Sequence, residues 1–207
     1  MNTLRFLFAL TFLSSSNVFA ADWPTWGGDA TRNMVSFEED LDFDFDPGEM
    51  NDDESVNMET TTNIKWVAKL GSQAYGNVTI ANGRVFAGTN NESPRDGGKK
   101  GDRGVVMCFN EKSGDLEWQL VIPKLGAGKV SDWEYIGVCS SPAIEGNKVY
   151  VVTNKCEVVC LDIEGFKNGN DGPYMDEANY VKPKGTQDVL NEELDADIIW
   201  MYDMRDE

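Results

Sequence analysis

The sequence predicts an all-β fold made of repeated antiparallel units, and three observations lead to this prediction. Residues 80–89, IANGRVFAGT, align without a gap with residues 144–153, IEGNKVYVVT. Each copy is followed by a matching apolar strand, at 106–110 and at 158–162. A reverse-turn pattern and a tryptophan follow the first of these strands. Because one such unit cannot bury its apolar face alone, we expect the units to form a stack or a ring.

The turn after the first matching strand carries a specific motif. From its start the sequence reads Cys108-x-Asn110-x-x-Ser113-Gly114-x-x-x-Trp118. The Asn and the Ser-Gly pair favour a reverse turn, with the Gly available for positive φ, and the Trp supplies a large apolar plate. The motif resembles the pattern Ala-x-Asp-x-x-Thr-Gly-x-x-x-Trp of the pyrroloquinoline-quinone-like (PQQ-like) β-propeller repeats, in which the tryptophan docks between blades. Here Cys, Asn and Ser replace Ala, Asp and Thr.

The second copy begins the same motif as Cys160-x-Asp162 and resumes at Trp200, after an insertion between residues 163 and 197. A further tryptophan, Trp66, is similar to the one that closes a preceding blade. The resemblance implies that the three tryptophans pack between blades. It also implies that the two motif cysteines are small buried hydrophobic residues.

The resemblance covers about residues 63–203 and implies four-stranded antiparallel blades near 63–118 and 137–200. Propellers need four to eight blades, each of about 40–50 residues. The chain has 207 residues and two recognisable repeats. We therefore expect residues 63–207 to form an incomplete ring of about two to three blades, as an N-terminal fragment of a longer propeller. The alternative is a small β-sandwich, whose edge strands would need protection.

The first 20 residues have the features of a secretory signal peptide. Arg5 is followed by an apolar run from Phe6 to Leu13, and small residues precede a cleavage site after Ala20. The run is too short for a transmembrane helix, which needs about 20 apolar residues. We therefore expect an exported chain without a membrane span, periplasmic or extracellular, whose mature N-terminal segment is residues 21–62. The opening residues of that segment also resemble the mature start of secreted members of the family.

The charge balance is strongly acidic. Eighteen Lys and Arg residues stand against 36 Asp and Glu residues, which gives a formal net charge of -18. Such a charge repels nucleic acids and anionic lipid surfaces, so neither is an expected partner. Residues 38–59 contain no Lys or Arg, and this composition predicts a solvated, flexible arm.

Within the arm, Asp42, Asp44 and Asp46 alternate and are weak candidates for a calcium site. A calcium loop counted from Asp42 would need Gly at its sixth position and Glu at its twelfth. The sequence has Pro47 and Asp53 there, so the solvated arm is the favoured interpretation.

The four cysteines would enter an oxidising compartment if the chain is exported, and this permits disulfides. In an up-and-down blade the start of one strand and the turn after its neighbour lie at the same end. This topology brings Cys139 and Cys156 toward each other, and we expect a disulfide between them. No Cys-x-x-Cys-His motif for covalent haem attachment occurs.

A polar, Gly-rich loop over residues 90–103 joins two strands of the first repeat. Its cations Arg95, Lys99, Lys100 and Arg103 are candidates for an anionic ligand, because loops at blade rims carry binding function. Ordinary solubilising charge is the favoured alternative.

Catalysis has little support in the sequence. The chain contains no His, which removes the commonest general base and the usual zinc ligand. Ser140 and Ser141 lack a partner base. Trp133 falls outside the repeat pattern and is a candidate for a residue that lines a channel or an upper surface.

Two functions remain open at this point. The first is a non-catalytic propeller that presents a binding or assembly surface in the cell envelope, with a protein or small-molecule ligand at the propeller face and no assured cofactor. The alternative is a quinoprotein dehydrogenase that oxidises an alcohol or sugar with pyrroloquinoline quinone and calcium. Blades outside this chain would complete its site.

Overall fold

A computed structural model describes residues 21–39, 41, 43–128, 130 and 132–205. The predicted signal peptide and the calcium candidate Asp42 lie outside these residues.

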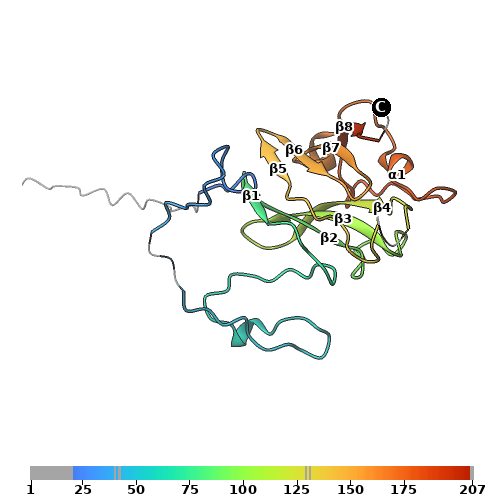
Figure 1. Ribbon diagram of the computed structural model, residues 1–207. Coiled ribbons are helices and arrows are strands. Elements are labelled where there is room, and N and C mark those ends of the chain that lie inside the picture. The colour runs from blue at the N-terminus through green and yellow to red at the C-terminus, as the bar shows by residue number, and fades with distance from the viewer. Residues whose placement is uncertain (1–20, 40, 42, 129, 131, 206–207) are drawn as a thin grey trace, which may run out of the picture.

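Two four-stranded antiparallel sheets form the body of the protein (Figure 1). In each sheet, strands that follow one another in the chain are hydrogen-bonded neighbours, so each sheet is an up-and-down unit. Blade 1 consists of β1 (Thr79–Ala81), β2 (Arg84–Asn90), β3 (Arg103–Asn110) and β4 (Leu116–Pro123). Blade 2 consists of β5 (Ala143–Glu145), β6 (Lys148–Val152), β7 (Glu157–Asp162) and β8 (Ile198–Asp203). The prediction of an all-β fold made of PQQ-like blades is confirmed.

Within the described residues, helical structure is confined to three short pieces. They are η1 (Met58–Thr60), η2 (Gly165–Asn168) and α1 (Glu177–Tyr180). The last two lie in the insertion between β7 and β8.

The two blades repeat each other in register as well as in topology. In blade 1, Cys108 pairs with Phe86 on one side and with Trp118 on the other. In blade 2 the same row is Tyr150, Cys160 and Trp200. A register shift follows the cysteine in both sheets. The repeat seen in the sequence is therefore a repeat of side-chain positions on the sheet.

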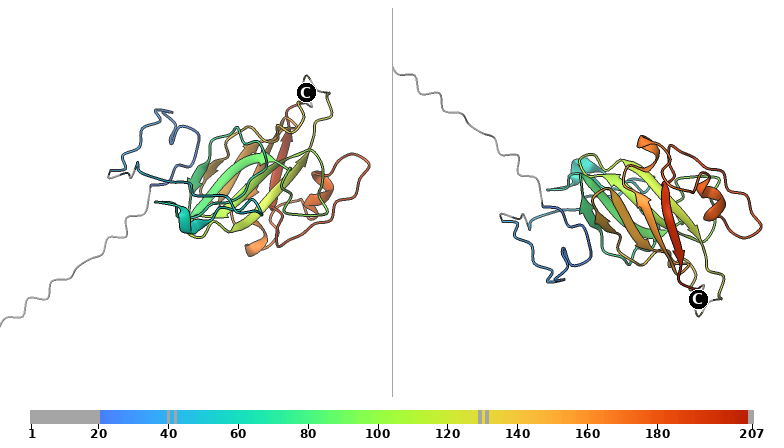
Figure 2. Two further views of the ribbon diagram at one scale, coloured as in Figure 1. Left: turned by 90° about the horizontal axis from the view of Figure 1, so that it is seen from below. Right: turned by 90° about the horizontal axis from the view of Figure 1, so that it is seen from above.

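The main core lies between the blades, whose sheets overlie each other in Figure 2. Trp118, Leu120 and Ile122 of β4 pack there against Val149 and Val151 of β6. A smaller cluster on the other face of blade 1 includes Val105, Met107 and Phe109, and it is covered by Trp66, Ala68 and Leu70. Blade 1 is thus enclosed on both faces.

The blade boundaries differ from the expected ones. Residues 63–78 belong to no strand, although the sequence predicts a blade from residue 63. They contribute their apolar side chains to the face of blade 1 instead of joining its ladder. Strand β4 continues to Pro123, because its apolar run extends five residues past the motif tryptophan.

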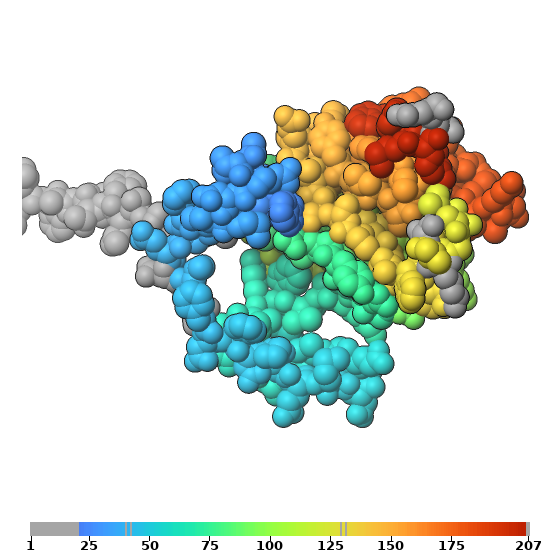
Figure 3. Space-filling model, in the orientation of Figure 1, coloured from blue at the N-terminus to red at the C-terminus, as the bar shows by residue number. Residues whose placement is uncertain are grey.

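The acidic arm has a backbone structure of its own. Asp46 and Thr62 exchange two backbone hydrogen bonds of 3.1 Å, and Met50 forms an antiparallel bridge with Val56. The arm, coloured cyan, projects from the blades in Figure 3, with openings between it and the body. The N-terminal segment is anchored separately, where Trp23 and Ile80 exchange backbone hydrogen bonds.

Candidate interaction surface

The motif tryptophan of blade 1 docks on the turn between β7 and β8 of blade 2. The Trp118 indole is 1% exposed, and its Nε1 donates to the Ile163 carbonyl at 3.0 Å. Gly165 lies under the ring with φ of 61°, and a Cβ atom there would be 2.9 Å from Trp118 Cδ1. The turn therefore provides both an acceptor for the indole and the space for its ring.

Trp66 makes the same contact with blade 1. Its Nε1 donates to the Glu111 carbonyl at 2.9 Å, across the same sequence separation of 45 residues as in the Trp118 contact. Gly114 has φ of 77°, and a Cβ atom there would be 2.6 Å from the Trp66 ring. Asn110 shapes this turn, because its Oδ1 accepts from the backbone N–H of Ser113 at 3.2 Å. Asp162 has the same place in blade 2, where its Oδ1 accepts from the Glu164 N–H at 2.7 Å.

Trp200 occupies the equivalent position in blade 2, but no turn covers it within the described residues. It is 39% exposed, and its contact with the Tyr150 ring, at 6.0 Å between centroids, lies within its own sheet. The matching contact in blade 1, between Phe86 and Trp118 at 5.9 Å, is fully buried.

The same contrast holds for the neighbouring row of side chains. Leu120 of β4 is 2% exposed, whereas Tyr202 at the corresponding position of β8 is 54% exposed. Val152 of β6 is 43% exposed. We call Tyr150, Val152, Trp200 and Tyr202 the outward face of blade 2. On blade 1 the equivalent side chains are those that pack against the next blade, so this face is a packing surface of the same kind.

The cations of the 90–103 loop have a structural role that the sequence analysis missed. The Lys99 ammonium is buried and paired with Asp195. The Arg103 guanidinium bonds Asp188 at 2.5 Å. Neither cation is free for an anionic ligand, so that interpretation is wrong for both. The two ion pairs join residues about 90 positions apart, so no short sequence pattern near either residue predicts them.

The two other loop cations are exposed. The Arg95 guanidinium donates to the Lys69 carbonyl. Lys100 contributes its own carbonyl, which accepts a 3.0 Å hydrogen bond from the Arg103 Nε.

All four cysteines of the chain are free, so the disulfide expected between Cys139 and Cys156 is absent. The ladder of β5 and β6 begins where Ala143 faces Tyr150, and its register, if extended four residues, would place Cys139 opposite Asn154 and not Cys156. The motif cysteines Cys108 and Cys160 are fully buried, and burial raises the pKa of both thiols. All four positions are therefore thiols, two exposed and two buried.

The described acidic residues of the arm do not converge on a common site. Asp44 and Asp46 are exposed, and the Asp46 carboxylate accepts from the Gly48 N–H at 2.9 Å. In the part of the chain that the structure covers, no group of three or more His, Cys, Asp or Glu side chains could hold a metal ion. The described residues thus do not fit the calcium ion that would accompany a quinone cofactor.

The remaining candidates lie near the start of blade 2. Ser140 Oγ donates to the Val152 carbonyl at 2.6 Å, so the hydroxyl supports the backbone. Ser141 is partly buried before Pro142. Trp133 is 64% exposed and borders a shallow cleft of about 380 Å³ that also contacts Lys124.

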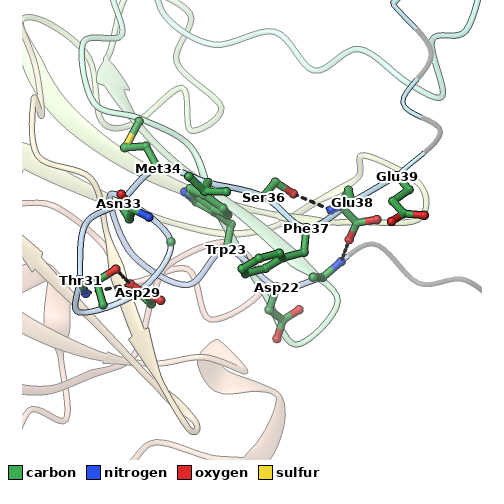
Figure 4. A pocket seen from close by; sticks show the side chains of 14 residues that line it. Asp22, Trp23, Asp29, Thr31, Asn33, Met34, Ser36, Phe37, Glu38 and Glu39 are labelled. Carbon is green, nitrogen blue, oxygen red and sulfur yellow. Dashed lines mark hydrogen bonds between the residues drawn. The ribbon is translucent and has the colours of Figure 1, made fainter.

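A larger hollow of about 820 Å³ lies in the N-terminal segment (Figure 4). Trp23 lies at its centre, and the surrounding loop is held by a 2.6 Å bond from the Ala21 N–H to Glu38. Phe37 on its wall is 94% exposed, and hydrogen bonds from Thr31 lower the pKa of the Asp29 carboxyl. The hollow has the volume of a ligand pocket but lacks converging buried polar groups.

Comparisons with known proteins agree with the architecture. No helix in the described residues has the length and apolar character needed to cross a membrane. A search of curated proteins gave no match. The family model described as "Outer membrane protein assembly factor BamB" matches residues 52–170, which is more than half of the chain. The protein therefore belongs to this family of PQQ-like repeat proteins.

Proposed function

We propose that the protein is a non-catalytic binding or assembly scaffold of the cell envelope. The outward face of blade 2 carries this proposal. Its side chains correspond to residues that blade 1 buries against blade 2, so this face is suited to pack against another protein surface, either a further blade or a partner protein. Aromatic residues such as Trp200 and Tyr202 are the residue types that dominate protein–protein interfaces.

The partner that fits this face is a protein. Its row of aromatic and aliphatic side chains repeats a row that blade 1 buries against another sheet. A sheet face of this kind suits a protein surface better than a small molecule, which binds in a concave pocket. The net charge of -18 disfavours nucleic acid and anionic lipid.

Two observations support the cell envelope as the location. The first 20 residues have the sequence features of a signal peptide. The description of the matched family names an assembly factor for outer membrane proteins.

The experiment that tests the non-catalytic role is a titration of the protein with pyrroloquinoline quinone and calcium. Intrinsic tryptophan fluorescence and a dye-linked dehydrogenase assay are the readouts. The scaffold account predicts no saturable quenching at tens of micromolar quinone, from protein shown by circular dichroism to be folded. Saturable quenching together with calcium-dependent dye reduction would establish the dehydrogenase and contradict the scaffold.

A further inference from the structure

Four buried oxygen atoms at the base of the β7–β8 insertion have no hydrogen-bond partner among the described residues. They are Asp162 Oδ2, Asn170 Oδ1, Glu177 Oε2 and Asp197 Oδ1. The three carboxyl side chains belong to residues that are at most 1% exposed. Buried carboxyl groups without partners are strongly unfavourable, so this cluster requires a physical explanation.

The other oxygen of each acid already has a donor. Asp197 Oδ2 accepts from the Asp171 N–H at 2.9 Å, and Glu177 Oε1 accepts from Asn170 Nδ2 at 3.2 Å. The Asp162 N–H donates to the Asp197 carbonyl at 3.1 Å, which fixes the end of β7 against the start of β8. The unpartnered oxygens therefore belong to side chains whose positions are already set.

No cation neutralises these acids in the described residues. The ionisable side chains that act on Asp197 are all acids: Asp162 and Asp171 through their charges, and Glu177 through a side-chain hydrogen bond. Lys99 borders a small cavity next to Glu177, but its ammonium is paired with Asp195. A metal ion does not supply the charge either, because no set of acidic, His or Cys side chains in the described residues could hold one.

We propose that Glu177 and Asp197 share one proton between Glu177 Oε2 and Asp197 Oδ1, and that this proton fastens the insertion to blade 2. One O–H group then gives a partner to two of the unpartnered oxygens at once. The pair carries one negative charge instead of two, which lowers the repulsion from the neighbouring acids. The shared proton makes the attachment of residues 170–197 sensitive to pH.

The direction of the pH dependence follows from the environment of the pair. The pKa of Asp197 is raised to about 6, chiefly by burial and with a contribution from the charges of Asp162 and Asp171, against the hydrogen bonds from the Asp171 N–H and the Glu177 side chain. Burial also raises the pKa of Glu177, and the charge of Asp197 adds to this effect. Because the two carboxyl groups interact, these raised pKa values describe the titration of the Glu177–Asp197 pair and not of either residue alone.

A carboxyl whose pKa is higher in the folded state stabilises the fold most when it is protonated. The stabilisation is complete below the unfolded-chain pKa of 3.8 and is lost as the pH rises through about 6. Of the other groups that face the pair, Asp162 comes from β7 and Asp171 from the insertion. Lys99 and Asp195 lie across the small cavity as a closed ion pair. The insertion is therefore held more tightly at pH 5 than at pH 7.5.

Amide hydrogen exchange of residues 170–197 at pH 5 and pH 7.5, corrected for the intrinsic pH dependence of exchange, tests this proposal. A pair that titrates with a pKa of about 6 predicts a roughly tenfold increase in the opening equilibrium of this segment at the higher pH. Glu177→Gln replaces the shared proton with a permanent amide donor. The variant should lose the pH dependence and keep the protected state at both values.

Three further results decide the proposal. Asp197→Asn should lose the pH dependence as Glu177→Gln does. The same result in both variants would show that the effect comes from the shared proton and not from a structural defect of one variant. Glu193→Gln, an exposed change in the same insertion, should keep the wild-type pH dependence. Equal protection of the wild type at both pH values would overturn the proposal. Protection at pH 7.5 that appears only when calcium is added would also overturn it, because the acids would then hold a cation.

Discussion

Trp118 and Trp200 form a natural matched pair for measuring how much blade docking contributes to stability. Both occupy the same position in their blades and face an aromatic ring across the same distance, but only Trp118 is covered by a second sheet. Trp118→Ala removes a fully buried indole and leaves a cavity, which costs about 3–5 kcal/mol. It also leaves the Ile163 carbonyl without its donor.

The cost of Trp200→Ala is smaller because the ring is 39% exposed and water fills the space that it leaves. We expect a loss of about 2 kcal/mol or less from the reduced apolar burial. The two variants should therefore differ by about 2 kcal/mol, which is roughly 1 M in the urea midpoint. Equal losses would refute the account of docking, because they would show that position in the sheet and not coverage sets the contribution.

Urea unfolding followed by far-ultraviolet circular dichroism is suitable for this comparison, since the backbone dominates this signal and the removed tryptophans affect it much less than they affect intrinsic fluorescence. The slope of the transition has to be the same for the wild type and both variants for the midpoints to report stability. Trp200→Phe provides a control that keeps an aromatic ring on the outward face.

Three further predictions concern the turns, the loop cations and the thiols. Gly165→Ala should lower stability by about 1–3 kcal/mol more than Gly146→Ala, because both residues have positive φ near 60° but only the first would place a Cβ against the tryptophan. Thermal unfolding measures the difference, and equal losses would show that the indole does not need the glycine. Lys99→Met should cost about 3–5 kcal/mol by leaving the buried Asp195 carboxylate without its cation and with the Asn191 N–H as its remaining donor, and the added change Asp195→Leu should restore most of it. Two thiols should react with a thiol reagent in the native protein and four after unfolding, whereas no native reaction would indicate that the exposed pair is oxidised.

The parts of the fold that the sequence predicts correctly are those determined by residues that lie close together in the chain. The repeated hairpins define the two sheets, and the motif from Cys108 to Trp118 identifies the family because turn, glycine and tryptophan lie within eleven residues. The motif also locates the outward face of blade 2, since Trp200 occupies the equivalent position in the second copy. These features depend on local conformation and on a repeat that can be aligned.

The features that the sequence did not predict depend on contacts between distant segments. The Lys99–Asp195 pair spans 96 positions, and nothing near either residue indicates the other. The acidic composition of the arm predicts solvation but carries no signal for the backbone bonds between Asp46 and Thr62. The pairing of Cys139 with Cys156 was inferred from blade topology. The register of β5 and β6, if extended past Ala143, would instead place Cys139 opposite Asn154.

The central claim is that the outward face of blade 2 binds a protein partner in the cell envelope. Photo-cross-linking in cells, with a photoreactive amino acid at Tyr202 and a control at the exposed Val189 of the insertion, tests it most directly. The account predicts one discrete cross-linked protein from position 202, none from position 189, and loss of the product in Trp200→Ala. No product from position 202, or the same product from both positions, would contradict the claim.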